Sequence, residues 1–178
     1  MDLGLAGRTA LVTGASVGIG RGIARALAAE GVRVAITARR REKLEELAAE
    51  IVGAGGAQPV LIEQDMYAED AAARLAEAAT QGLGQVDILV NNAGGSRSFK
   101  DLHVSEAQWQ EAMTLNFTRP RQLAKALLDQ MIARKWGRII NITGKSEPEG
   151  VNGAFSAKAG IHAWAKGLSR EVGKFGIT

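Results

Sequence analysis

The sequence predicts an α/β fold in which a doubly wound parallel sheet lies between two layers of helices, a three-layer α/β/α arrangement in a single domain over residues 1–178. Two observations predict it. Short apolar runs alternate along the chain with stretches whose apolar residues recur at helical spacing, which is typical of successive strand–helix units. The fourth predicted strand, Val86–Val90, is so rich in apolar residues that both its faces are expected to be covered, as in a central strand. Right-handed connections between such strands place helices on both sides of the sheet.

The first half of the chain alternates strand and helix three times. Strands are predicted at 9–13, 32–37 and 60–62, where apolar and β-branched residues cluster. The first two helices are predicted from apolar residues three or four positions apart: Ile19, Ile23, Ala26 and Leu27, then Leu44, Leu47, Ala48 and Ile51. Gly31 and the glycine cluster at 53–56 end these two helices. An alanine-rich segment predicts a third helix at 68–81.

Two helices are predicted between the fourth strand and the fifth. Ser105 and Gln108 have the spacing of a capping box, in which each side chain bonds the backbone N–H of the other residue, and this predicts a helix start. Apolar residues from Leu123 to Met131 recur at helical spacing and predict the second helix. Pro120 stands near its beginning, where the missing N–H of proline costs no helical hydrogen bond.

The C-terminal part is predicted as a strand at 138–142 followed by a long helix at 156–174. The final residues, 175–178, have the character of an approach to another strand. Because nothing after them closes the far edge of the sheet, either the fold is shorter than its pattern suggests or a C-terminal part is absent from this sequence. We expect the second, in which the C-terminal strands are absent.

Composition and charge exclude several classes of function. The chain has no cysteine, which excludes disulfides and thiolate catalysis, and its two histidines, His103 and His162, are too far apart in sequence to suggest a zinc site, so we expect no metal. A net charge of +3 with short basic clusters argues against nucleic-acid binding. No apolar stretch is long enough to cross a bilayer and the N-terminus lacks the pattern of a signal peptide. We therefore expect a cytoplasmic protein with no membrane partner.

A glycine-rich turn, TGASVGIG, follows the first strand from Thr13 to Gly20. Glycines at such a turn let the backbone bend tightly, approach a pyrophosphate and pack the next helix against the strand. The helix that starts inside the motif presents unpaired N–H groups and the positive end of its dipole to phosphates. A glycine-rich turn without a ligand is the alternative, but the strand–turn–helix context favours a Rossmann-type dinucleotide site. The absence of a following Gly-Lys-Ser/Thr excludes a P-loop.

This turn has the form TGxxxGxG, and further segments complete a resemblance to the short-chain dehydrogenase/reductase family. The NNAG motif of that family corresponds to Asn91–Gly94, directly after the fourth strand. Asn116, the strand at 137–142 and the segment Ala157–Gly160 match further family positions, in family order and at near-family spacing. The resemblance implies reversible hydride transfer between a nicotinamide dinucleotide and a secondary alcohol or ketone.

The end of the second strand indicates which dinucleotide is bound. Relatives that prefer NAD usually carry an acid there for the ribose 2′-hydroxyl, whereas this chain has Ala38 followed by Arg39. A guanidinium can bind a 2′-phosphate through charge-assisted hydrogen bonds, so NADP is predicted over NAD, unless Arg39 is only a solvated surface charge. Asp65 resembles the adenine-contacting acid of the family or else caps the next helix. The residues predicted to contact the cofactor are Gly14, Ser16, Gly18, Ile19, Gly20, Arg39, Asp65, Asn91 and Lys158.

The catalytic positions of the family are only partly matched. In the family, a tyrosine four residues before a lysine exchanges the proton, a serine orients the substrate oxygen and an asparagine supports a proton relay. Lys158 and Asn116 match their positions, whereas the tyrosine and serine positions hold Ala154 and Gly144. Ser146, in the loop that follows, is the predicted substitute hydroxyl and completes the predicted catalytic set with Asn116 and Lys158. Asn116 is alternatively a residue that caps or kinks its helix.

Three interpretations follow from this mismatch. Another proton donor serves the family reaction, drawn from Ser146, Lys145, Glu147 or a water held by Lys158. Alternatively, the domain binds a dinucleotide without redox chemistry, as a sensor or partner subunit, or the chain is a degenerate or engineered version of an active enzyme. We expect the first: an NADP(H)-dependent oxidoreductase that acts on a small-molecule alcohol or carbonyl substrate with a non-standard proton donor. The resemblance also implies a homodimer or homotetramer, and a substrate-reading loop that this sequence lacks.

Overall fold

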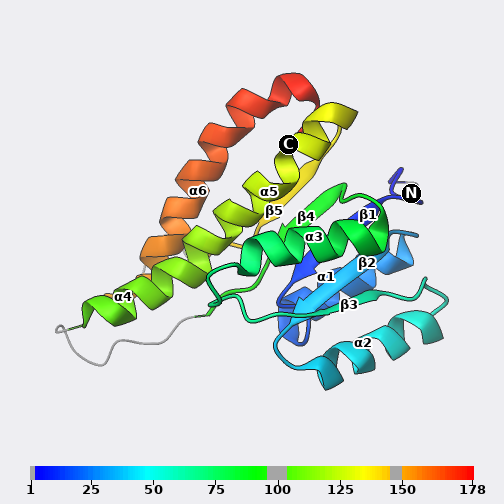
Figure 1. Cartoon of the computed structure of the whole chain (residues 1–178), viewed down its shortest axis with the longest axis horizontal. Coiled ribbons are helices and arrows are strands. Elements are labelled where there is room, and N and C mark those ends of the chain that lie inside the picture. The colour runs from blue at the N-terminus through cyan, green and yellow to red at the C-terminus, as the bar shows by residue number, and fades with distance from the viewer. Residues whose placement is uncertain (1–2, 96–103, 145–149) are drawn as a thin grey trace.

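The computed structural model describes residues 3–95, 104–144 and 150–178 and shows five parallel strands in one sheet (Figure 1). The spatial order is β3-β2-β1-β4-β5. The strands span Thr9–Thr13 (β1), Arg33–Ala38 (β2), Val60–Glu63 (β3), Ile88–Asn91 (β4) and Arg138–Asn141 (β5). Because β1 pairs with both β2 and β4, the strand order reverses between β1 and β4, and the predicted doubly wound sheet is confirmed.

Helices connect the strands in the predicted alternation. They span Gly18–Ala29 (α1), Arg41–Gly53 (α2), Ala71–Leu83 (α3), Glu106–Met113 (α4), Arg119–Arg134 (α5) and Gly153–Val172 (α6). A π-helical turn, η1, joins α4 to α5 at Thr114–Thr118, and a 3-10 turn, η2, follows α6 at Gly173–Phe175. The predicted capping box of α4 is confirmed, since Ser105 Oγ accepts from the N–H of Gln108 and Gln108 Oε1 accepts from the N–H of Ser105.

Two hydrophobic cores lie on opposite faces of the sheet, because successive residues of a strand point to opposite sides. In β1, Leu11 belongs to the core under α3 and α5, whereas Ala10 and Val12 belong to the core under α1 and α2. Figure 1 shows α3 and α5 side by side across one face of the sheet. The three-layer arrangement predicted from the sequence is thereby confirmed.

Helix α6 begins at Gly153 rather than at the predicted residue 156. The cause is the side chain of Asn152, whose Oδ1 accepts from the N–H of Ala154 at 2.9 Å and of Phe155 at 3.3 Å and so caps the first turn. The earlier start matters for the site. It places Ala154 one helical turn before Lys158, on the same face of α6.

The buried face of α1 also differs from the prediction. Gly20, Ala24 and Ala28 are buried, whereas Ile19, part of the predicted apolar stripe, is 64% exposed. Ile23 and Leu27 of the predicted stripe are partly buried against the same core, as expected. The fully buried positions of α1 are nevertheless its small residues, which let the helix lie close to the sheet.

The last residues begin to pair with β5, as the sequence predicts for an approach to another strand. Gly137 and Ile177 form a parallel bridge. The N–H of Thr178 donates to the carbonyl of Gly137 at 3.1 Å, and the N–H of Ile139 donates to the carbonyl of Thr178 at 2.9 Å. Ile177 is fully buried in the core on the α5 side, so packing holds the segment as well.

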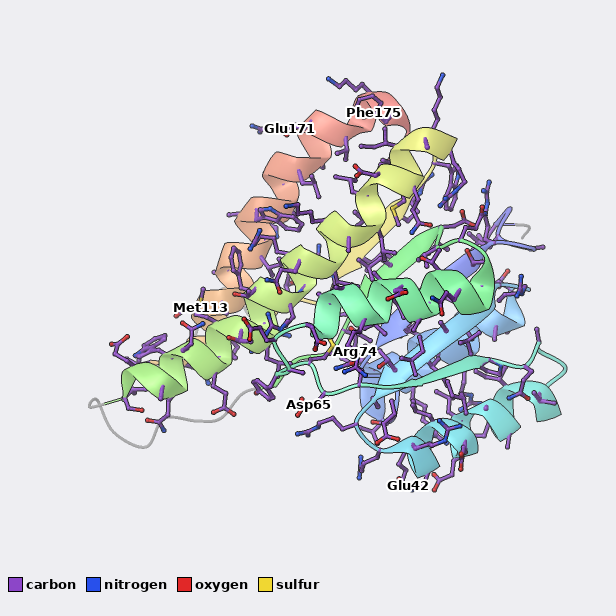
Figure 2. All side chains as sticks on the ribbon, in the orientation of Figure 1. Glu42, Asp65, Arg74, Met113, Glu171 and Phe175 are labelled. Carbon is purple, nitrogen blue, oxygen red and sulfur yellow. The ribbon has the colours of Figure 1, made fainter. Side chains whose placement is uncertain are left out.

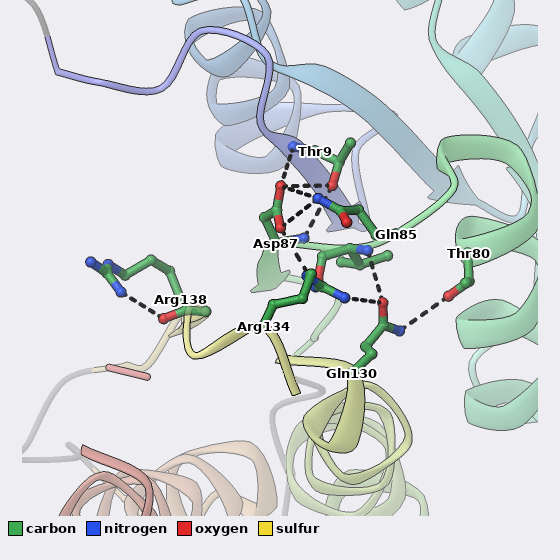
Figure 3. A network of polar contacts seen from close by, with 9 residues as sticks. Thr9, Thr80, Gln85, Asp87, Gln130, Arg134 and Arg138 are labelled. Atoms are coloured by element: carbon green, nitrogen blue, oxygen red, sulfur yellow. Dashed lines mark hydrogen bonds and ion pairs between the residues drawn. The ribbon is translucent and has the colours of Figure 1, made fainter. Parts of the chain in front are cut away.

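A polar network around Asp87 holds the amino-terminal ends of the strands (Figure 3). The carboxylate of Asp87 accepts from the backbone N–H of Thr9 at 3.1 Å and from its hydroxyl at 3.2 Å, and Arg134 lies 3.5 Å away. Gln130, on the helix of Arg134, donates to Thr80 Oγ1 at 3.2 Å. The network ties β1, α3 and α5 together at the edge of the sheet opposite to the carboxyl ends.

Candidate dinucleotide site

A cavity of about 670 Å³ lies at the carboxyl ends of the strands, beside the point where the strand order reverses. Ligands of open α/β sheets bind at this place. Of the residues predicted to contact the cofactor, the ones that line the cavity are Gly14, Ser16, Arg39 and Asp65. The predicted residues that do not line it are Gly18, Ile19, Gly20, Asn91 and Lys158.

The glycine turn between β1 and α1 is locked to the segment that follows β4. Thr13 Oγ1 accepts from the N–H of Asn92 at 2.9 Å and of Ala93 at 2.8 Å. In return, Asn92 Nδ2 donates to the carbonyls of Thr13 at 2.9 Å and Gly14 at 3.1 Å. A Cβ at Gly14 would lie 2.9 Å from the Cα of Ala93, and one at Gly20 would run into Asn92 Nδ2 and the carbonyl of Gly14. Glycine is therefore required at both positions by the close approach of two backbones.

The start of α1 has the properties of an anion site. Val17 stands at its N-cap, and no side chain caps the first turn. Gly18 has a φ of +59°, and within the described part of the chain no atom beyond its chain neighbours and its own helix backbone lies within 4 Å of the place where its Cβ would be. Arg21 steadies the turn by donating to the carbonyl of Ser16 at 3.2 Å. Uncapped amides at the positive end of a helix dipole favour a phosphate group.

Two arginines stand at the end of β2, where the sequence predicts one. Arg39 and Arg40 both line the cavity, next to Ala38. Within residues 3–95, 104–144 and 150–178, neither forms an ion pair with a carboxylate. Two unpaired guanidinium groups can bind a phosphate at this end of the cavity. Arg40 was missed in the sequence, although its position directly after Arg39 was a usable signal.

Asp65 lies in the segment between β3 and α3 (Figure 2). It lines the cavity together with its neighbours Met66 and Tyr67, so this segment forms one wall. Its Oδ1 accepts from the N–H of Tyr67 at 3.0 Å, which stabilises a turn. Because α3 begins only at Ala71, the alternative in which Asp65 caps that helix is wrong.

Gly94 connects the cavity to the predicted catalytic residues. It lines the cavity, and a Cβ at this position would lie 2.9 Å from Asn116 Oδ1 and 3.5 Å from Lys158 Nζ. Asn116 comes from the π-helical turn and is 3% exposed, whereas Lys158 comes from α6 and is half-buried. The fold thus brings the two residues together behind one lining residue.

The π-helical turn positions Asn116. Its Nδ2 donates to the carbonyls of Ala112 at 3.0 Å and Gly95 at 3.1 Å, and its Oδ1 accepts from the N–H of Gly95 at 3.3 Å. Pro120, four residues later, has no N–H to offer the carbonyl of Asn116, and such gaps accompany distorted helical turns. The helix is distorted near Pro120, as the alternative interpretation of Asn116 requires, and Asn116 also lies beside Gly94.

Lys158 is held by the end of β5. Its Nζ donates to the carbonyl of Ile142 at 3.1 Å. Burial lowers the pKa of Lys158 below its ordinary value, because a less hydrated ammonium is disfavoured. No carboxylate of the structurally described segments pairs with it. The hydrogen-bond partner of the ammonium is therefore a neutral carbonyl, which leaves its charge uncompensated within these segments.

The two positions that differ from the family lie in the same region. Ala154 lines the cavity. A Cβ at Gly144 would lie 3.2 Å from Cδ1 of Phe155 and 3.5 Å from Cδ of Lys158, so the Phe155 ring fills the space beside Gly144. The residues of interest that lie outside the described parts of the chain are His103, Lys145, Ser146 and Glu147.

Asn91 is 4% exposed, and its side chain is turned into the interior. Its Nδ2 donates to Asn141 Oδ1 at 2.9 Å and to the carbonyl of Pro120 at 3.3 Å. Asn91 lines a small cavity behind the large one, together with Lys158. In this position its side chain ties β4 to β5 and α5 beneath the site.

Two absences bear on the class of site. Among residues 3–95, 104–144 and 150–178, no group of three or more His, Cys, Asp or Glu side chains is placed to hold a metal ion. None of the helices formed by these residues is long and apolar enough to span a bilayer. The polar side chains that line the cavity include Arg39 and Arg40, and arginines, like the amides at the start of α1, are ligands for phosphate.

The comparisons with known proteins agree with this geometry. A family model described as short chain dehydrogenase matches residues 8–178. Nodulation protein G of Rhizobium sp. (strain N33) is 40% identical over 177 residues, which are 98% of this chain and 71% of that protein. The 3-oxoacyl-(acyl-carrier-protein) reductase of Aquifex aeolicus (strain VF5) is 34% identical over 175 residues, 97% of this chain and 71% of that protein. A solved structure of a metagenomic short-chain oxidoreductase in complex with NADP has a TM-score of 0.91 and 37% identity, and covers 97% of this chain and 80% of that one. The chain therefore belongs to the short-chain dehydrogenase family.

Proposed function

We propose that the chain is an NADP(H)-dependent oxidoreductase that interconverts a small ketone and its secondary alcohol. The observation that supports this most directly is the position of Gly94. It lines the same cavity as Gly14 and Arg39 and lies against Asn116 and Lys158. One continuous site thus joins a phosphate-binding turn to a pair of polar groups suited to a reacting oxygen. The NADP bound in one structural neighbour supports the choice of dinucleotide.

Different residues of this chain would bind different parts of the dinucleotide. The uncapped amides of α1 and Ser16 would bind the pyrophosphate, and Arg39 with Arg40 would bind the 2′-phosphate. Asp65 would contact the adenine, and Lys158 the ribose on the nicotinamide side. When bound, the cofactor supplies the hydride for reduction of the carbonyl carbon and accepts it in the reverse direction.

Reduction of a ketone also requires a proton at the oxygen, and this chain must supply it without the family tyrosine. Lys158 carries a half-buried ammonium whose lowered pKa makes its proton easier to release. Asn116 is fixed by hydrogen bonds beside it. We assign the proton transfer to the ammonium of Lys158 together with the hydroxyl of Ser146, with Asn116 as a fixed polar neighbour that gives up no proton. In the oxidation direction the same groups take the proton from the alcohol.

A non-catalytic dinucleotide-binding sensor or partner subunit is the second candidate. The observation that favours it is Ala154, a buried methyl side chain at the position of the family tyrosine. Loss of a general acid typically lowers a rate by a factor of about 10²–10⁴, which a sensor would tolerate and an enzyme would have to offset.

The test is turnover of a ketone series with NADPH, followed by the absorbance of the reduced nicotinamide, with Lys158→Ala as the comparison. Ketone-dependent oxidation of NADPH that is lost in Lys158→Ala would support the oxidoreductase. Saturable NADPH binding without turnover of any ketone would favour the sensor, and absence of binding would contradict both. Light scattering on the same protein tests the accompanying proposal of a homodimer or homotetramer.

A further inference from the structure

Arg119 is a buried cation at the first residue of α5 that the proposed reaction does not use. It is 8% exposed, and its guanidinium has no carboxylate partner among the residues whose structure is described. Its Nε donates to the carbonyl of Met66 at 3.0 Å, and its Nη2 donates to the carbonyl of Tyr67 at 3.4 Å. Its Nη1 donates to Gln122 Oε1 at 2.7 Å. A buried charge is costly unless its donors are satisfied, so these neutral acceptors are what keep Arg119 in place.

The two backbone carbonyls belong to the wall of the large cavity. Met66 and Tyr67 line it together with Gln64 and Asp65. The wall is fixed at its beginning by the N–H of Gln64, which donates to the carbonyl of Ala38 at 3.1 Å. At the other end of the wall, Arg119 of α5 holds the carbonyls of Met66 and Tyr67. Its own side chain stays behind the wall and does not line the cavity.

We propose that Arg119 is a positioning residue, which holds the wall at 64–67 at the distance from Arg39 and the glycine turn that the adenosine half of the dinucleotide requires. The inference rests on the proposed cofactor site but does not depend on turnover. Arg119 directly follows the π-helical turn that carries Asn116. The start of α5 therefore organises both ends of the site.

Arg134, the last residue of the same helix, provides a matched control (Figure 3). It donates to the carbonyl of Val86 at 2.9 Å and to Gln130 Oε1 at 3.3 Å. Both arginines thus join α5 to a backbone carbonyl and to a glutamine of their own helix, and Arg134 differs in that it also lies 3.5 Å from the carboxylate of Asp87. The carbonyls held by Arg119 lie in the cavity wall, whereas Val86 lies at the opposite edge of the sheet. Matched substitutions separate loss of stability from loss of binding.

The experiment measures binding of NADPH and of 2′,5′-ADP, which represents the adenosine half, by titration calorimetry on the full chain. We expect Arg119→Met to weaken both ligands about tenfold, which corresponds to about 1.4 kcal/mol. Arg119→Lys should weaken them less, because an ammonium can still donate to one carbonyl. Arg134→Met should lower the melting temperature but leave both dissociation constants unchanged.

Equal affinities in the unaltered protein and the Arg119 variants would overturn the positioning role, and so would an equal loss in Arg134→Met. If Arg119→Met does not fold, the comparison of Arg119→Lys with Arg134→Lys decides in the same way. Binding to the unaltered protein without ketone turnover would contradict the oxidoreductase function and leave the order of the Arg119 variants as a separate result. Absence of any binding to the unaltered protein would overturn both proposals.

Discussion

Lys158 Nζ lies 3.1 Å from the carbonyl oxygen of Ile142, so the end of β5 holds the ammonium of the family lysine in a fixed direction. Gly94 lines the cavity, and a Cβ at this position would lie 3.5 Å from the ammonium. A cation with a fixed direction and reduced hydration is suited both to holding a ribose hydroxyl and to giving up a proton. In the proposed reaction, which lacks the family tyrosine, Lys158 is therefore the group that we expect to matter most.

The lowered pKa of Lys158 predicts an alkaline limit to cofactor binding. Burial penalises the charged form of Lys158. Its ammonium therefore loses the proton at a lower pH than an ordinary lysine side chain, whose pKa is about 10.4. NADPH affinity is therefore expected to fall as the pH rises through this lowered pKa. In Lys158→Arg the fall should disappear from the accessible range, since a guanidinium stays charged. Fluorescence titrations of reduced nicotinamide across pH measure both proteins, and the same fall in both would assign it to another group.

The arginines at the end of β2 predict the dinucleotide preference. Arg39 lines the cavity, whereas Arg41 pairs with Glu45 on α2 at 3.0 Å. Arg39→Ala is expected to weaken NADPH about ten- to a hundredfold, since a hydrogen bond to a charged group contributes about 1.5–3 kcal/mol. NADH affinity should stay unchanged, because NADH has no 2′-phosphate, and Arg41→Ala should bind NADPH as the unaltered protein does. Equal losses of NADPH and NADH affinity in Arg39→Ala would contradict contact with the 2′-phosphate.

The fold was predictable because its signals are local. The apolar residues of β4 and the capping box of α4 are each contained in a few consecutive residues, and both features are present in the structure. The predicted start of α6 was wrong because Asn152, a common N-cap type, was not recognised as the cap of the first turn. The exposed Ile19 shows the other limit, since periodicity cannot reveal that small residues form the packed face.

The residues of the site likewise fall into those that local sequence predicts and those that it does not. Gly14 and Arg39 were predictable because the turn and the strand end that carry them are set by neighbouring residues. Asn91 and Arg119 contact residues that lie 50 and 53 positions away in the chain, respectively. No local sequence pattern predicts such contacts. Residues that position the site from behind therefore emerge only from the folded structure.

The glycines of α1 predict opposite effects of the same substitution. A Cβ at Gly20 would run into Asn92 Nδ2 and the carbonyl of Gly14, whereas a Cβ at Gly22 meets nothing within 4 Å. Gly20→Ala is expected to lower the free energy of unfolding by about 1–3 kcal/mol and to weaken NADPH binding, because it forces the glycine turn away from the segment after β4. Gly22→Ala should raise the free energy of unfolding by about 0.5–1 kcal/mol, since alanine favours helix. Urea unfolding measures both, and equal effects would contradict the contact at Gly20.

Ala154→Tyr is expected to raise the turnover of ketones. Ala154 lines the cavity one helical turn before Lys158, so a phenol there would extend toward the reacting oxygen with the ammonium beside it. A positioned general acid contributes about 10²–10⁴-fold, and even a poorly aligned one should raise kcat about tenfold. Gly144→Ser alone should have little effect, because its Cβ would crowd Phe155 at 3.2 Å. Ala154→Phe supplies the ring without the hydroxyl and is the control. Equal gains from Phe and Tyr would trace the effect to packing, and no gain from Tyr with NADPH affinity retained would contradict the assignment of position 154 to proton transfer.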